Sequence, residues 1–163
     1  MQKIEFVLKR LDDTEKLGNL LGRLAVPGDV ICLDGDLGAG KTALTQAIAR
    51  GVGVDKSCYV TSPSFAILHE YPGKMVMYHM DFYRLEDSLE VEDLGFLEYI
   101  YGQGLTVIEW SARAAELLPE NRLILELTLE EDLSRTVRGA AGDPDNKFIL
   151  AIRENFVTMT TDI

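Results

Sequence analysis

The residues with the clearest chemical pattern run from Gly35 to Thr42 and read Gly-Asp-Leu-Gly-Ala-Gly-Lys-Thr. They fit the phosphate-loop pattern Gly-x-x-x-x-Gly-Lys-Thr in full. Glycines let the backbone curl until successive N–H groups converge on one point, and a helix that begins there adds the positive end of its dipole. Lys41 would bring a positive charge to the β- and γ-phosphates, and the Thr42 hydroxyl is placed to hold Mg²⁺. The stretch therefore predicts a nucleoside triphosphate site with contacts from Gly35, Asp36, Leu37, Gly38, Ala39, Gly40, Lys41, Thr42 and Ala43.

Two acidic residues stand where later strands are predicted to end. The strand 74–81 ends in Asp81, and the strand 105–109 ends in Glu109. The carboxyl ends of parallel strands share one edge of a sheet with the loop, so both carboxylates can converge on it. Either acid alone could simply face water. Beside a triphosphate, we expect both to act at Mg²⁺ or at the attacking water, and Lys41, Asp81 and Glu109 form the predicted catalytic set.

The sequence favours adenine over guanine as the base. A GTPase would carry Asn-Lys-x-Asp, whereas the Asn146-Lys147 pair is followed by Phe148-Ile149 and lacks the acid. The expected ligands are therefore ATP and Mg²⁺.

Composition sets limits on the partners and the compartment. The chain has 163 residues, 27 of them acidic and 16 basic, with a formal net charge of −11. This length fits one domain spanning residues 1–163. The charge repels phosphate backbones at long range, so any contact with nucleic acid should be indirect or weak. The apolar runs are far shorter than the ~20 residues that span a bilayer, and the two cysteines lack zinc spacing. We expect a cytoplasmic protein with no membrane contact.

Elements that could position the loop alternate along the chain. The apolar run 30–34 predicts a buried strand before the loop, and good helix formers follow it at 42–50. A helix carrying Leu17, Leu20, Leu21 and Leu24 precedes them. The predicted fold is α/β, a P-loop NTPase-type three-layer sandwich with a mixed, mainly parallel central sheet and antiparallel additions. The other expected strands are 3–9, 65–71, 74–81, 105–109, 122–129 and 136–140, and the other expected helices end near 100 or span 111–118 and 147–156.

Four blocks resemble the TsaE (YjeE) family of ATPases in their order and spacing. The blocks are Gly35–Thr42, Ser62-Pro63-Ser64-Phe65, His79-Met80-Asp81-Phe82-Tyr83-Arg84 and Ile108-Glu109-Trp110. The resemblance runs from about residue 14 to about residue 135. It implies a small P-loop ATPase that works with the partner proteins TsaB and TsaD in making the threonylcarbamoyl modification of adenosine in tRNA. P-loop ATPases often need a group from a partner, so hydrolysis by the chain alone should be slow.

The resemblance also assigns residues by position. Thr42 and Glu109 would be the magnesium-side residues, and Asp81 a second acid near the metal or the attacking water. Thr14 and Arg135 match family positions near the nucleotide. Ser64 departs from the more usual Thr but keeps the hydroxyl.

Three residues in these blocks keep two interpretations each. His79 is either ordinary hydrogen-bonded structure or a residue that orients the Asp81 loop. Trp110 is either core or part of a partner surface. Arg84 either forms a surface ion pair or stabilises charge at the γ-phosphate.

Two other functions remain open at this point. A small-molecule kinase would need a pocket rich in arginines and a mobile lid, whereas the nine arginines are scattered. A nucleotide-sensing module would order residues 62–65 and 79–84 when ATP binds, and its hydrolysis would be incidental.

Overall fold

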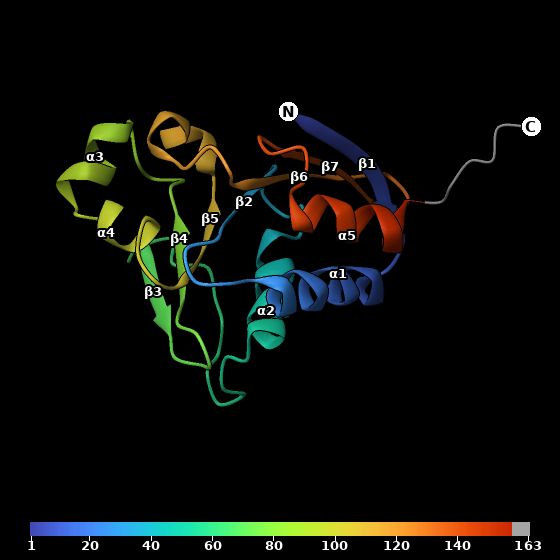
Figure 1. Cartoon of the computed structure of the whole chain (residues 1–163), viewed down its shortest axis with the longest axis horizontal. Coiled ribbons are helices and arrows are strands. Elements are labelled where there is room, and N and C mark those ends of the chain that lie inside the picture. Colours follow the sequence, from blue (N-terminus) through green and yellow to red (C-terminus); the bar gives the residue numbers. More distant parts are fainter. Residues whose placement is uncertain (158–163) are drawn as a thin grey trace, which may run out of the picture.

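A seven-stranded sheet forms the centre of the computed structural model, which describes residues 1–157 (Figure 1). The strand order is β1-β7-β6-β2-β5-β4-β3. The four middle strands, β6, β2, β5 and β4, run parallel, and the pairs at both edges are antiparallel. This confirms the predicted mixed sheet. The strands are β1 (Gln2–Leu8), β2 (Val30–Asp34), β3 (Leu68–Tyr71), β4 (Met77–Asp81), β5 (Leu105–Glu109), β6 (Leu123–Leu129) and β7 (Arg135–Ala141).

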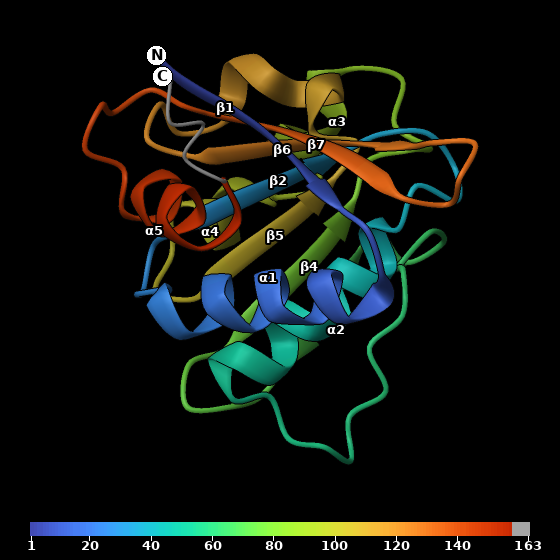
Figure 2. The ribbon, with the colours of Figure 1, turned by 90° about the vertical axis from the view of Figure 1, so that its right-hand side faces the viewer.

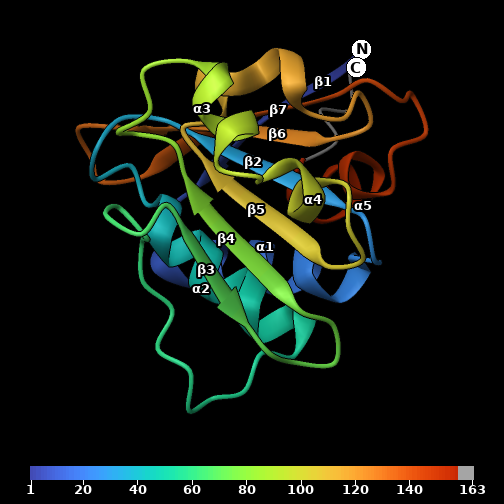
Figure 3. The same cartoon turned by 90° about the vertical axis from the view of Figure 1, so that its left-hand side faces the viewer.

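Helices cover both faces of the parallel part of the sheet (Figures 2 and 3). All of β5 and all but the last residue of β2 are buried, because each strand packs against one hydrophobic cluster on either face. No helix within residues 1–157 combines the length and the apolar character needed to cross a membrane. One face carries α1 (Leu11–Leu24), α2 (Lys41–Val52) and α5 (Lys147–Phe156), and the other carries α3 (Ser88–Asp93), α4 (Leu97–Ile100) and the 3₁₀ helix η1 (Ser111–Leu117).

The antiparallel end of the sheet buries one face and exposes much of the other. Phe6 and Leu8 of β1 point into the core, whereas the alternating residues Lys3, Glu5 and Val7 are exposed, as the predicted alternation requires. On the outer face, Glu5 accepts a hydrogen bond from Nε of Arg138 on β7 at 2.8 Å, and both side chains are largely exposed.

Two glycines let the loop's helix, α2, lie directly against α1. A Cβ atom at Gly18 would lie 2.3 Å from the Cβ of Ala47, and one at Gly22 would lie 2.3 Å from the carbonyl oxygen of Ile48. Any larger side chain at either position would push the helices apart. The close contact fixes α2, and with it the glycine loop that leads into it.

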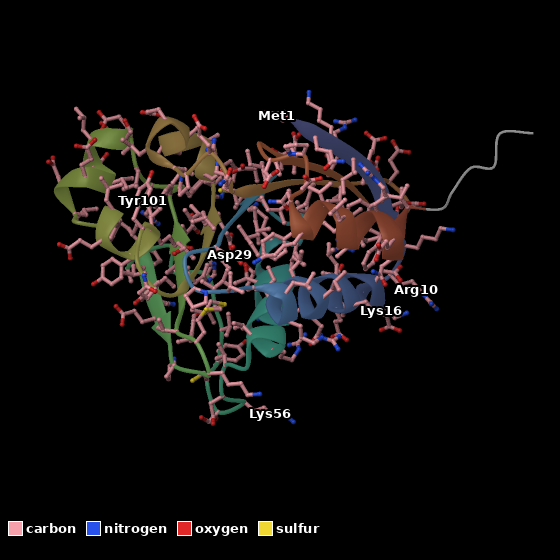
Figure 4. The ribbon with its side chains drawn as sticks, viewed as in Figure 1. Met1, Arg10, Lys16, Asp29, Lys56 and Tyr101 are labelled. Atoms are coloured by element: carbon pink, nitrogen blue, oxygen red, sulfur yellow. The ribbon has the colours of Figure 1, made fainter. Side chains whose placement is uncertain are left out.

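The turn before β2 is tied to α5. The carboxylate of Asp29, labelled in Figure 4, accepts a hydrogen bond from Nζ of Lys147 at 2.6 Å. Asn146 caps the same helix, since its Oδ1 accepts from the backbone N–H groups of Phe148 and Ile149 at 3.0 and 3.2 Å. The Asn-Lys pair therefore serves helix α5, which spans the predicted residues.

Three segments differ from the sequence prediction in length or type. The strand predicted over 65–71 begins only at Leu68, because Ile67 adopts a left-handed conformation (φ 67°) and its N–H donates to Pro63 O at 2.7 Å. Its partner begins at Met77, so the hairpin loop is longer than a two-residue turn. The helix expected at 111–118 is a 3₁₀ helix with a kink at Ala114.

Candidate nucleotide-binding site

The glycine loop connects β2 to α2 and bends sharply at its glycines. Gly35, Gly38 and Gly40 have φ values of 141°, 81° and 105°. A Cβ atom at Gly35 would lie 2.3 Å from the carbonyl oxygen of Leu127 in β6, so no larger residue fits between the loop and the sheet. Helix α2 begins directly after Gly40, and its first N–H groups have no partner within the helix. The chain thus forms the strand, loop and helix succession that the sequence predicts.

Lys41 holds its ammonium group inside the loop. Its Nζ donates to the carbonyl oxygens of Gly35 and Asp36 at 2.6 and 2.9 Å. The same atom lies 4.8 Å from the centre of the Trp110 ring, whose face attracts cations. The side chain is buried, and its charge is stabilised by loop carbonyls that a phosphate group could replace.

Both predicted carboxylates lie at one edge of the sheet. Asp81 and Glu109 are register partners at the ends of β4 and β5, and they are 4% and 3% exposed. Each is hydrogen-bonded, as a buried charge requires. Asp81 accepts from the Ser62 hydroxyl at 2.6 Å and from the Tyr83 backbone N–H at 2.9 Å. Glu109 Oε1 lies 2.9 Å from Nε2 of His79. The convergence expected from parallel strands is confirmed.

A pocket of about 440 Å³ opens in front of the loop. Three aromatic side chains and Arg84 also line it. Tyr83 packs against Trp110 with ring centres 5.0 Å apart, and the Arg84 guanidinium lies 4.2 Å from the Phe65 ring centre. Phe65 is 84% exposed. The pocket brings together the predicted residues Leu37, Gly38, Gly40, Lys41, Thr42, Ala43, Asp81 and Glu109.

Comparison with known proteins identifies the family. A family model described as "Threonylcarbamoyl adenosine biosynthesis protein TsaE" matches residues 8–137. The chain belongs to the TsaE family. The tRNA threonylcarbamoyladenosine biosynthesis protein TsaE of Bacillus subtilis (strain 168) is 41% identical over 138 residues, which cover 84% of this chain and 85% of that protein. The protein of the same name from Treponema pallidum (strain Nichols) is 39% identical over 131 residues, covering 80% of this chain and 96% of its own.

A solved structure agrees with the TsaE assignment. The crystal structure of YdiB from Bacillus subtilis superposes with a TM-score of 0.76 at 33% sequence identity. The match covers 94% of this chain and 93% of the other. Both the family resemblance and the predicted α/β fold are therefore confirmed.

Two residues that the TsaE resemblance assigns to the nucleotide lie outside the pocket lining. Arg135, at the start of β7, lies against the loop, and its Nε donates to the Ala39 carbonyl at 3.3 Å. Thr14 is buried in the first turn of α1. Gly35, Asp36 and Ala39 also lie outside the lining and belong to the loop backbone.

The oxygen atoms at the TsaE pocket suit a metal shared with phosphates. The Thr42 hydroxyl and the carboxylates of Asp81 and Glu109 are hard oxygen ligands of the kind that Mg²⁺ takes. In the part of the chain that the structure describes, no three His, Cys, Asp or Glu side chains gather closely enough to hold a metal. The residues therefore fit a Mg²⁺ ion that substrate phosphates help to coordinate, as is usual for this ion.

One pair of hydrogen bonds near the TsaE pocket could not be predicted from the sequence. Asp34, the last residue of β2, accepts from the Ser111 backbone N–H at 2.7 Å and from its hydroxyl at 2.6 Å. Between Glu109 and Ser111, Trp110 adopts a left-handed conformation (φ 57°), which is unusual for a large side chain. These hydrogen bonds attach the turn that contains Glu109 and Trp110 to β2, the strand that leads into the glycine loop.

The histidine of the TsaE motif is not hydrogen-bonded to Asp81 among the described residues. The sequence left open that His79 orients the Asp81 loop, but its Nε2 contacts Glu109 instead, and Asp81 is held by Ser62 and the Tyr83 backbone.

The two cysteines take no part in the pocket lining. Both are free thiols. Cys32 lies inside β2, where burial raises the pKa of its thiol to about 12. It is therefore protonated and inert at neutral pH.

Proposed function

We propose that the chain binds ATP with Mg²⁺ in the pocket at Lys41, hydrolyses it slowly, and serves the biosynthesis of threonylcarbamoyladenosine in tRNA. One observation carries the nucleotide part: the glycine loop, Lys41 and two buried carboxylates meet at a single pocket. The pathway follows from membership of the TsaE family.

The residues divide the work as follows. The loop amides and Lys41 bind the β- and γ-phosphates, and Thr42 with Glu109 holds the metal. When bound, Mg²⁺ would supply positive charge that offsets the negative charge developing on the phosphates. Lys41 leaves the carbonyls of Gly35 and Asp36 for the phosphate oxygens, which offer a stronger charge-assisted bond.

The two carboxylates differ in how many of their oxygens already accept hydrogen bonds. Both oxygens of Asp81 already accept hydrogen bonds, from Ser62 and the Tyr83 backbone. Glu109 uses only Oε1 among the hydrogen bonds of the described residues. We assign Glu109 Oε2 to the metal and Asp81, held rigid by two donors, to the orientation of the attacking water.

The mouth of the pocket is where partners would act. Leu37 of the loop is 73% exposed, and Phe65, which lines the same pocket, is also exposed. Exposed apolar residues around a polar site mark interaction surfaces. We propose that TsaB and TsaD meet the chain here and raise its turnover. The net charge of −11 supports a role in which those partners make the tRNA contacts.

The pocket does not support the kinase alternative. Among the described residues Arg84 is the single arginine in its lining, so no arginine cluster is present for an anionic acceptor. The two free cysteines fit a reducing compartment, and we place the activity in the cytoplasm.

The test is ATP turnover by wild type, Lys41→Ala and Glu109→Ala, each with and without TsaB and TsaD. We expect slow hydrolysis by wild type, acceleration by the partners, and loss in both variants. Unchanged turnover in both variants would rule out this site. Sustained tRNA modification with a non-hydrolysable ATP analogue would instead favour a nucleotide sensor.

A further inference from the structure

His79 is a buried polar side chain of the sheet whose role remains unassigned. It lies in the middle of β4 and is fully buried. Its side chain is on the same face as Met77 and Asp81, because alternate residues of a strand share a face. Two neighbours on that face, Met77 and the β5 register partner Val107, are apolar and fully buried. Burying a polar ring among such residues costs free energy unless the ring is hydrogen-bonded, so the hydrogen bond that the His79 ring makes indicates its role.

That contact defines the state of the ring. Nε2 lies 2.9 Å from Glu109 Oε1, whereas Nδ1 is buried with no hydrogen-bond partner among the described residues. An ionised carboxylate can only accept, so Nε2 carries the proton. A hydrogen on Nδ1 would be a second buried donor with no acceptor, which is more costly than an unpaired lone pair. The contacts therefore place a ring hydrogen on Nε2, where it is donated to Glu109.

We propose that His79 is a positioning residue that holds one oxygen of Glu109 and thereby leaves the other directed at the metal site. The proposal rests on the proposed function, since it gives Glu109 the magnesium-side role. A free glutamate side chain has several rotamers, and a single fixed donor to Oε1 selects among them. Partners of this kind usually change metal affinity or activity by 10- to 100-fold when they are removed.

Three substitutions separate a donor at Nε2 from simple space-filling. Gln places its amide nitrogen near the position of Nε2, and Asn reaches only as far as Nδ1. Phe fills the volume and donates nothing. His69 supplies the matched control, because it faces His79 across β3 and β4 but its Nδ1 contacts the Tyr71 hydroxyl at 3.1 Å.

The experiment measures ATP binding by calorimetry in EDTA and across a Mg²⁺ titration, together with turnover, for His79→Gln, His79→Asn, His79→Phe and His69→Gln. We expect the Mg²⁺ concentration that gives half of the maximal increase in ATP affinity and turnover to rise about 10-fold or more in the His79→Phe and His79→Asn variants. The two Gln variants should stay close to wild type, and binding in EDTA should be the same throughout. The proposal would be overturned if His79→Phe had the same Mg²⁺ dependence as wild type. It would also be overturned if His79→Asn and His79→Gln had the same Mg²⁺ dependence as each other.

A second measurement needs no nucleotide. Nitrogen-15 spectra of the wild-type histidines should show a hydrogen on Nε2 of His79, with the His79 signals moved by Glu109→Ala and unmoved by His69→Gln. An Nδ1–H tautomer would overturn the proposal even in a chain that hydrolyses ATP. Absence of turnover in wild type would reject the hydrolysis in the proposed function, while the spectra and the Mg²⁺-dependent binding would still decide the role of His79.

Discussion

The parallel and antiparallel parts of the sheet use polar residues in opposite ways. At the ends of β4 and β5, Asp81 and Glu109 are buried, and each is held by a specific donor. On the outer face of β1 and β7, the Glu5–Arg138 pair is exposed to water. Burying a charge is costly, whereas an exposed pair contributes little. The buried carboxylates lie beside the glycine loop. The parallel part of the sheet therefore carries the candidate site, and the antiparallel part has a structural role.

The two parts meet at the loop. The Leu127 carbonyl of β6 leaves room only for a glycine at position 35, and Arg135 of β7 bonds to the Ala39 carbonyl. Strands β6 and β7 thus contact the loop, while the parallel strands β4 and β5 supply its carboxylates.

Lysine substitutions should give the largest difference in ATP turnover between the candidate site and the antiparallel part of the sheet. Lys41→Ala should lower ATP turnover by about 100-fold or more, because it removes a buried charge aimed at the phosphates. Lys3→Ala, at an exposed position of β1, should leave turnover and ATP affinity unchanged. Steady-state assays of both variants check this. Equal effects of the two substitutions would remove the distinction between the parts.

Glycine substitutions test the contact between the glycine loop and β6. Gly35→Ala should lower the free energy of unfolding by about 2–5 kcal/mol, because it adds a clash with the Leu127 carbonyl to the strain of a positive φ. Gly38→Ala meets no atom within 4 Å and should cost only the strain, about 1–2 kcal/mol. Urea denaturation measures both. If Gly38→Ala proved the more damaging, the loop would not rest on β6 as described.

Hydrogen bonds to carboxylates offer a finer comparison. Ser111→Ala removes a 2.6 Å bond to partly buried Asp34 and should lower the free energy of unfolding by about 1–2 kcal/mol. Glu5→Gln, in the exposed pair with Arg138, should be hard to distinguish from wild type. Thermal and urea unfolding of both variants give the ranking, and the reverse order would contradict it.

Much of this arrangement follows from sequence, and the remainder depends on pairing across the sheet. Residues 30–34, 105–109 and 147–156 form the predicted elements because their apolar patterns are continuous or periodic. The loop is recognised because its chemistry is local. The Asp34–Ser111 tie joins residues 77 positions apart, and the His79–Glu109 contact joins residues 30 apart. Such contacts depend on strand order and register, which no local pattern encodes.

The smallest expected effect concerns the thiols. In the folded chain a thiol reagent at pH 8 should label Cys58 and leave Cys32 unmodified, because burial raises the pKa of Cys32 to about 12. Mass spectrometry of the labelled chain measures this, and urea should make both cysteines reactive. Rapid labelling of Cys32 without denaturant would show that the β2 layer opens more readily than its packing implies.

Calorimetric titration of ATP into the chain in millimolar Mg²⁺, beside Lys41→Ala, tests the central claim most directly. The account predicts saturable binding at one site in wild type that is abolished or strongly weakened by Lys41→Ala. No heat from wild type, or equal affinity in the variant, would contradict the assignment of this pocket to a nucleoside triphosphate.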